Sequence, residues 1–118
     1  MDSILNSIKK LLGIAEEDNS FDVDIMMHIN SVFVTLSQLG IGPRNGFAIT
    51  DEFTTWDEYF GEGKKNEMVK TYVYRKVQLV FDTPSNSAVL GAMERSINEL
   101  EWRLNVEAET PSMTTEEG

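Results

Sequence analysis

The chain lacks cysteine, and this absence excludes three kinds of site at once. Without a thiol there is no disulfide scaffold, no thiolate metal centre and no cysteine nucleophile. Histidine is nearly absent as well, because His28 is the only one in 118 residues. A metal centre built on histidine is therefore not expected, and we assign His28 to a boundary position inside a helix rather than to catalysis.

Long hydrophobic runs are also missing. No stretch approaches the roughly 18 apolar residues that a bilayer-spanning helix needs, so no membrane partner is expected. The N-terminal sequence MDSILNSIKKLLG has no basic region ahead of an uninterrupted apolar run, which argues against a secretory signal peptide. We therefore expect an intracellular protein or a component of a virus particle.

Positive charge is scarce. The chain has 10 Lys and Arg against 20 Asp and Glu, which gives a formal net charge of −10. Such a chain is repelled by phosphates, so it is not expected to bind nucleic acid through its overall field. The acidic run that starts at Asp18 resembles a calcium loop but has Val23 and Ile29 where that loop needs Gly and Glu. Because no nucleophile–base pair or oxyanion loop can be assembled either, we predict no enzyme activity, no catalytic residue, no metal and no cofactor.

The hydrophobic pattern predicts an all-α fold, a small bundle of about four to five helices. Spacings of three and four predict helices over residues 3–12, 22–39, 54–59, 64–81 and 84–106, and their apolar positions, Leu11 and Val80 among them, are expected to face the core. Lys9 and Lys10 lie in the last turn of the first helix, where cations suit the helix dipole. Glycines and Pro43 interrupt this pattern and predict a long loop over residues 40–53. We expect one helical domain over residues 1–106. An acidic, extended tail over residues 107–118 follows it and needs a partner to order it.

Polar residues at the expected helix ends indicate where each helix begins. Ser3 (or Asp2) is predicted to cap the first helix, which Gly13 ends. Ser20 or Asp22 is predicted to cap the second helix. The short helix that follows the loop is capped by Thr54 or Thr55.

The helix over residues 84–106 is expected to organise the fold, with Thr83 as its cap and Pro84 in its first turn. One apolar stripe runs along it, formed by Leu90, Met93, Ile97, Leu100 and Leu104. The preceding segment YVYRKVQLVF, residues 72–81, is rich in β-prone side chains, so a strand is the alternative there. Strict alternation fails at Val80-Phe81, which favours a helix and hence an antiparallel helical hairpin.

Two surfaces are candidates for contacts with other proteins. Residues 64–76 hold five basic residues and one acidic residue, a net charge of +4, so the rest of the chain carries −14. This cluster is either a solvated helix face or a surface that meets an acidic region of a neighbouring copy or partner. The long loop is the other candidate, because long loops in compact domains are usually functional. The predicted inter-subunit or tail-side contacts are Arg44, Asn45, Phe47, Lys64, Lys65, Lys70, Arg75 and Lys76.

The order of these motifs resembles that of a known family. SILNSIKKLLGI is followed by an acidic link, the helix DVDIMMHINSVFVTLSQLG, the loop IGPRNGFAI and a Trp-containing turn. The end of the YVYRKVQLVF helix then leads into a last helix that closes with ELEWRLNV. Over about residues 3–106 the chain resembles the head–tail connector (adaptor) proteins of long-tailed bacteriophages.

The resemblance implies a structural protein of the virion neck, made in the host cytoplasm. Copies, typically twelve, would form a ring below the portal that extends the DNA channel and binds a tail-completion or stopper protein. DNA would pass through without specific binding, since an acidic wall repels it. In relatives the C-terminal segment docks on the portal, which by position places portal contacts at Leu104, Val106, Pro111 and Met113.

The alternative function is that of an acidic DNA mimic that inhibits a host DNA-binding protein. A small helical domain with a net charge of −10 would suit that role. The basic cluster over residues 64–76 fits it poorly, because a mimic should present continuous negative charge.

Overall fold

The computed structural model describes residues 3–61 and 66–109, and within this part the backbone of the chain is mostly helical. The helices are α1 (Ile4–Leu12), α2 (Asp22–Gln38), α3 (Trp56–Phe60), α4 (Glu67–Phe81) and α5 (Ser87–Glu109). The described residues form no strand, only an isolated bridge between Ser3 and Thr55. The predicted all-α fold with about five helices is confirmed, and the strand alternative for residues 72–81 is wrong.

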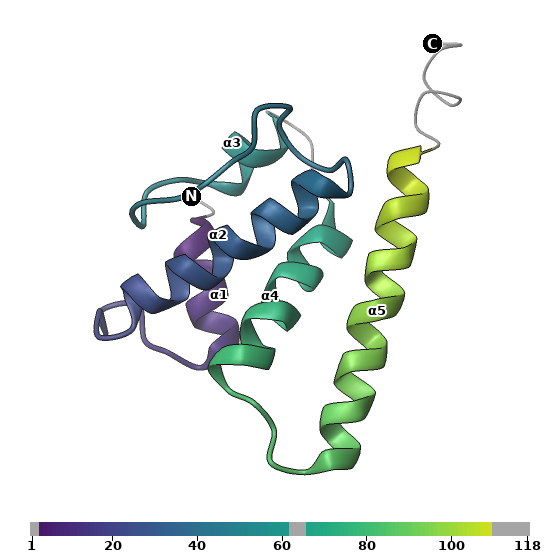
Figure 1. The fold of residues 1–118 in the computed structure, drawn as a ribbon. Coiled ribbons are helices and arrows are strands. Elements are labelled where there is room, and N and C mark those ends of the chain that lie inside the picture. Colours follow the sequence, from purple (N-terminus) through teal and green to yellow (C-terminus); the bar gives the residue numbers. More distant parts are fainter. Residues whose placement is uncertain (1–2, 62–65, 110–118) are drawn as a thin grey trace.

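The centre of the bundle is α4, not the last helix as the sequence had indicated. It packs against α1, α2 and α5, whereas α5 packs mainly against α4 alone. In Figure 1, α2 crosses in front of α1, and α5 stands beside α4 at the edge of the molecule. The two last helices form the predicted antiparallel hairpin. The helix over residues 84–106 was given the central place because it is the longest, but position depends on long-range contacts.

Local capping fixes three helix ends as predicted. The Ser3 side chain accepts a hydrogen bond from the backbone N–H of Asn6 at 3.1 Å and starts α1. Gly13 ends α1 with a left-handed backbone, φ 82°. Thr55 starts α3 in a capping box with Glu58.

Two predicted helix caps are wrong. Phe21 occupies the N-cap of α2 and makes no side-chain cap, so neither Ser20 nor Asp22 caps this helix. α5 starts three residues later than predicted because Asn86 caps it, accepting hydrogen bonds from the N–H groups of two following residues at 2.8 and 3.2 Å. The Thr83 hydroxyl instead donates to the Leu79 carbonyl at 2.6 Å, at the end of α4.

The C-terminal helix has the predicted length of 23 residues but lies three residues further along the chain. α5 continues to Glu109, three residues beyond the expected end at Val106, so the first residues of the predicted tail are helical. Among the described residues, no helix combines the length and apolar character needed to cross a membrane.

The core contains one cluster of aromatic rings where the long loop and α3 meet α2. Phe33 of α2 stacks on Tyr59 of α3 at 4.7 Å between centroids, and Phe47 of the loop packs edge-on against both rings. Trp56 is buried in the same cluster and donates from Nε1 to the Ser7 hydroxyl at 2.9 Å. The rings therefore attach the loop to α1 and α2. Two residues predicted to be apolar core, Leu11 and Val80, are instead exposed.

A lysine is also part of the interior. Lys9 has 0% exposure, and its Nζ lies 2.8 Å from Asp22 Oδ1 and donates to the Glu16 carbonyl at 3.0 Å. This ion pair joins the end of α1 to the start of α2.

Candidate interaction surfaces

The basic residues of α4 do not form one continuous face. Lys70 Nζ lies over the Trp56 ring at 5.6 Å from its centroid and 3.8 Å from Glu67 Oε2. Lys76 points to α5, where its Nζ is 3.8 Å from Glu101 Oε2. Arg75 is half-buried in a groove between α1 and α4. The predicted cluster is thus divided between two sides of α4, while Lys64 and Lys65 lie outside the described residues.

A second link between α4 and α5 is a hydrogen bond to the same carboxylate. The Tyr72 hydroxyl is buried and donates to Glu101 Oε2 at 2.7 Å. Burial, together with this carboxylate, raises the pKa of Tyr72 well above its usual value. Burial alone raises the pKa of Tyr59 to about 12. Both phenols are therefore neutral packing groups at ordinary pH and are not candidates for acid–base chemistry.

The long loop is held to α2 by one side chain. Asn30 donates from Nδ2 to the Ile49 carbonyl at 2.9 Å and accepts from the Ile49 N–H at 2.7 Å. This pair of bonds satisfies the loop backbone much as a neighbouring strand would. Asn30 was not singled out from the sequence, and its position between buried residues of α2 was the signal that could have found it.

The three loop residues predicted as contacts lie in different environments. Arg44 and Asn45 are exposed at a turn that Gly46 closes by donating its N–H to the Pro43 carbonyl at 3.0 Å. Phe47 is half-buried in the aromatic cluster, so little of its ring is available to a partner. Arg44 and Asn45 therefore form the exposed tip of this loop.

The end of α5 holds the predicted portal contacts that the structure describes. Leu104 is fully buried in the core, and Val106 is 39% exposed. Trp102 lies on the opposite side of α5 from the buried stripe and is 67% exposed, although the sequence analysis had given it no role. Pro111 and Met113 lie outside the described residues.

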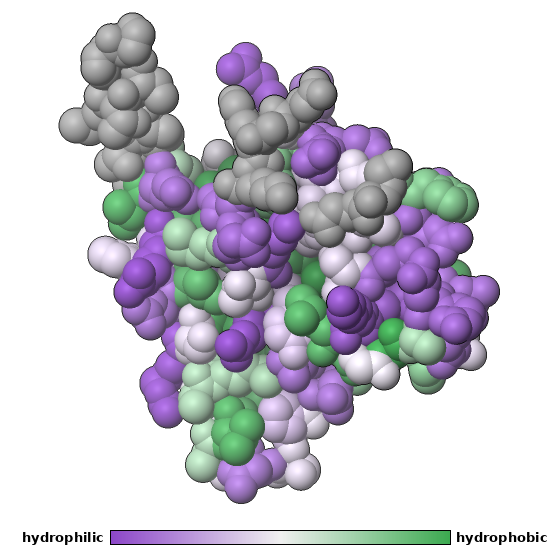
Figure 2. Space-filling view, turned by 180° about the vertical axis from the view of Figure 1, so that it is seen from behind, coloured by the Kyte–Doolittle hydropathy of each residue, from purple (hydrophilic) through white to green (hydrophobic). Residues whose placement is uncertain are grey.

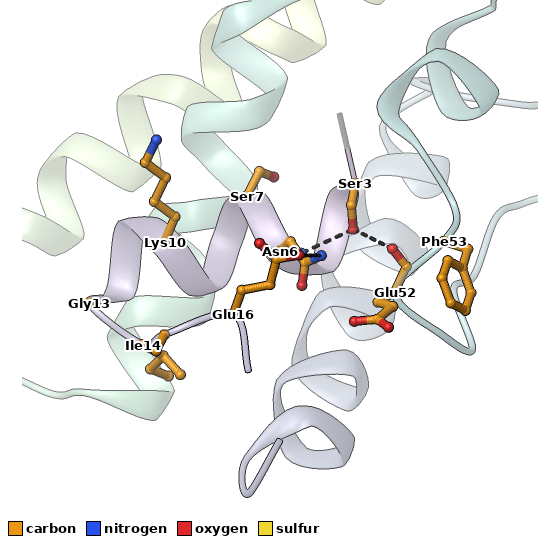
Figure 3. A pocket seen from close by; sticks show the side chains of 10 residues that line it. Ser3, Asn6, Ser7, Lys10, Gly13, Ile14, Glu16, Glu52 and Phe53 are labelled. Carbon is orange, nitrogen blue, oxygen red and sulfur yellow. Dashed lines mark hydrogen bonds between the residues drawn. The ribbon is translucent and has the colours of Figure 1, made fainter. Parts of the chain in front are cut away.

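A groove lies beside α1 and is lined by both polar and apolar residues (Figure 3). Ser3 donates from its hydroxyl to the Glu52 carbonyl at 2.6 Å, and Asn6 donates from Nδ2 to Glu16 Oε2 at 3.2 Å. Lys10 and Phe53 lie at its margins. These groups bind one another and hold the loop against α1. Neither here nor elsewhere in residues 3–61 and 66–109 do three or more His, Asp or Glu gather as a metal site would require.

Comparison with known proteins identifies the family. A family model described as phage connector protein matches residues 4–111, which include the five helices of the described residues. Searches of curated proteins and of solved structures found no match. This match favours the connector interpretation over the DNA mimic. The match implies a structural protein of the virion that contacts other virion proteins. The matched region extends five residues past residue 106, the predicted end of the helical domain. The chain therefore belongs to the phage connector protein family.

Proposed function

We propose that copies of this chain form a ring between the portal and the tail of a phage, with twelve copies by analogy with the head–tail connectors it resembles. The ring extends the DNA channel and presents a surface to a tail-completion or stopper protein. The observation that carries this proposal is the match of the phage connector family to residues 4–111. The net charge of −10 supports a channel wall that repels DNA as it slides past.

The two ends of the molecule suggest how it is oriented in the neck. A methyl group added to Gly40, where the long loop begins, would lie 3.5 Å from Cβ of Ala108 near the end of α5. The loop and the C-terminal end of α5 thus share one end of the molecule, and the α4–α5 turn lies at the other (Figure 1). If Val106 and the segment after it bind the portal, the loop tip at Arg44 and Asn45 faces the portal side or a neighbouring subunit. The tail-side surface then includes the α4–α5 turn.

A pull-down from infected cells tests the proposal. The full chain carries an N-terminal tag, and a matched version ends at Glu109, so that α5 stays whole while the last nine residues are removed. We expect the full chain to capture portal and tail-completion proteins, and the short version to fold but lose the portal. Capture of a host nuclease or repressor by both versions, without portal, would instead support the DNA mimic. Portal captured equally by both would show that the terminal segment is not the anchor.

A further inference from the structure

The groove between α1 and α4 is lined by both apolar and charged side chains. It encloses about 350 Å³ and includes Leu11 of α1 and Tyr74 and Arg75 of α4, with Trp56 beneath. Leu11 is exposed here, although it belongs to the apolar pattern of α1. The groove is therefore mostly apolar along its α1 side, and along its α4 side two cations, Lys70 and Arg75, outnumber one acidic residue, Glu67.

Arg75 is incompletely satisfied in the isolated chain. Its Nε is buried, yet it has no hydrogen-bond partner among the described residues. A buried donor without a partner costs roughly 1–3 kcal/mol, and more when the group is charged. A guanidinium pairs best with a carboxylate, which it can bind through two parallel hydrogen bonds. The groove thus fits an occupant that brings both a carboxylate and apolar side chains.

The outer face of α2 has that composition. Val23, Met27 and Val34 are exposed and follow one another at spacings of four and seven, which places them on one face of the helix. Residues 16–24, which lead into this face, contain five acidic residues and no basic residue. Asp24 is exposed beside Val23 and Met27. Exposed apolar side chains next to acidic ones complement a groove that is apolar and cationic.

The two surfaces lie on different sides of the molecule. α4 buries Val69 and Val73 in the core, whereas Thr71, which lines the groove, is roughly 160° around the helix from Val73 at about 100° per residue. The outer face of α2 is opposite the side that carries Ile25, Ile29 and Leu36 into the core. The opposite side of the molecule shows hydrophobic side chains between hydrophilic ones (Figure 2). Complementary patches on different sides produce a head-to-tail contact, which closes into a ring when the rotation permits.

We propose that the α1–α4 groove of one copy binds the outer face of α2 of the next copy, with Arg75 facing the acidic residues at the start of that helix. This inference rests on the proposed ring and identifies the surfaces that build it. The occupant is a second copy of the chain rather than nucleic acid, because the chain as a whole carries a net charge of −10 and repels phosphates.

Charge reversal and rescue test the proposed pairing of Arg75 with acidic residues of the next copy. Arg75→Glu and Asp24→Arg should each raise the concentration needed for assembly at least tenfold, measured by light scattering at low salt with the portal present. Both changes in one chain should restore assembly to within about threefold of wild type, because each interface then holds the reversed pair. Arg95→Glu, which makes the same charge change at an exposed position on α5, is the matched control and should assemble normally. Circular dichroism verifies that each variant is folded.

Cross-linking tests the geometry and is unambiguous because the chain has no cysteine. Leu11→Cys and Met27→Cys variants are prepared separately, mixed, assembled with portal and treated with a short bis-maleimide. We expect a dimer-sized product in the mixture and none from either variant alone. Products from one variant alone would mean two-fold pairing, and a product of another mass would mean that a different virion protein occupies the groove. Either result overturns the inference, as does normal assembly of Arg75→Glu.

The same experiments separate this inference from the proposed function. Rings of wild-type chain that give no cross-link between positions 11 and 27 would refute the assigned surfaces and leave the connector function standing. A wild-type chain that stays monomeric with the portal present would refute the ring itself, and the assigned surfaces with it.

Discussion

The buried ion pair between Lys9 and Asp22 gives the most direct test of how this fold is held together. Lys9 has no exposed surface, whereas the Asp22 side chain is 18% exposed. The two partners should therefore respond differently to removal. Asp22→Ala leaves an ammonium group in the interior with only the Glu16 carbonyl as its partner. Lys9→Met removes the buried charge and leaves a carboxylate that water can reach.

The expected free energies follow from this asymmetry. Removing one partner of a buried pair costs about 3–5 kcal/mol, so we expect roughly 3 kcal/mol for Asp22→Ala because some water reaches the site. Replacing the lysine by an apolar side chain of similar length should cost no more than about 1 kcal/mol. At about 2.1 cal/mol/K per residue, 118 residues give an unfolding entropy of roughly 0.25 kcal/mol/K. The first change should then lower Tm by about 12 °C and the second by about 4 °C or less.

Thermal and urea unfolding of the two single variants and the double variant measure these losses in the free energy of unfolding. We expect the double variant to be more stable than Asp22→Ala alone, with a coupling energy of roughly 2 kcal/mol. Lys10→Met is the matched control, because Lys10 is the exposed neighbour in the same turn, and its effect should stay within about 0.5 kcal/mol. Equal losses from both single changes that simply add in the double variant would refute the reasoning.

Three further predictions concern the loop and the core. Asn30→Ala should lower stability by about 2–3 kcal/mol because two buried hydrogen bonds to the loop are lost, and hydrogen exchange should rise specifically over residues 40–53. Gly42→Ala should destabilise the chain by more than about 2 kcal/mol, since the φ of Gly42 is +95° and the new methyl would lie 2.6 Å from the Tyr59 hydroxyl. Gly46 has a similar φ but open space around it, so Gly46→Ala should cost less. Since the pKa values of Tyr59 and Tyr72 are raised on folding, their stabilisation is present below pH 10 and is lost as the pH rises further. Urea unfolding between pH 9 and 11.5 should show stability falling by up to about 1.4 kcal/mol per pH unit for each tyrosine, and a flat profile would contradict the assignment.

The parts of the fold that depend on neighbouring residues could be predicted from the sequence. Ser3 and Thr55 cap their helices because the bonds they make reach only three residues along the chain. Helical spacing identified most buried residues of α2, α4 and α5 for the same reason. The start of α5 was missed because two sites compete to begin the helix there. Asn86 accepts hydrogen bonds from two backbone N–H groups, whereas a start at Pro84 would only remove one N–H group that needs a partner.

The parts that depend on distant residues could not be predicted in the same way. Helical spacing indicates which side of a helix is apolar, but it does not show where the neighbouring element ends, so Leu11 and Val80 were placed in the core although both are exposed. Lys9 was assigned to the dipole at the end of α1. It follows Leu5 at a spacing of four and therefore lies within the apolar stripe, which was the available signal for burial. The burial of the Lys9 charge depends on the Asp22 carboxylate, which reaches Lys9 only because α2 packs against α1.

The candidate contact surfaces occupy separate parts of the molecule, and this separation bears on function. The end of α5 and the α4–α5 turn lie at the two ends of the molecule (Figure 1), whereas the groove and the outer face of α2 lie along the lengths of α1, α4 and α2. A subunit in a ring must contact two neighbours laterally and two different assemblies axially, so these four contacts must not compete for the same surface. A change at Arg75 should therefore weaken ring assembly without weakening portal binding by a single subunit. Removal of the segment after Glu109 should do the reverse. If either change impaired both contacts equally, the lateral and axial surfaces would have to overlap, and the assignment of surfaces to partners would be wrong.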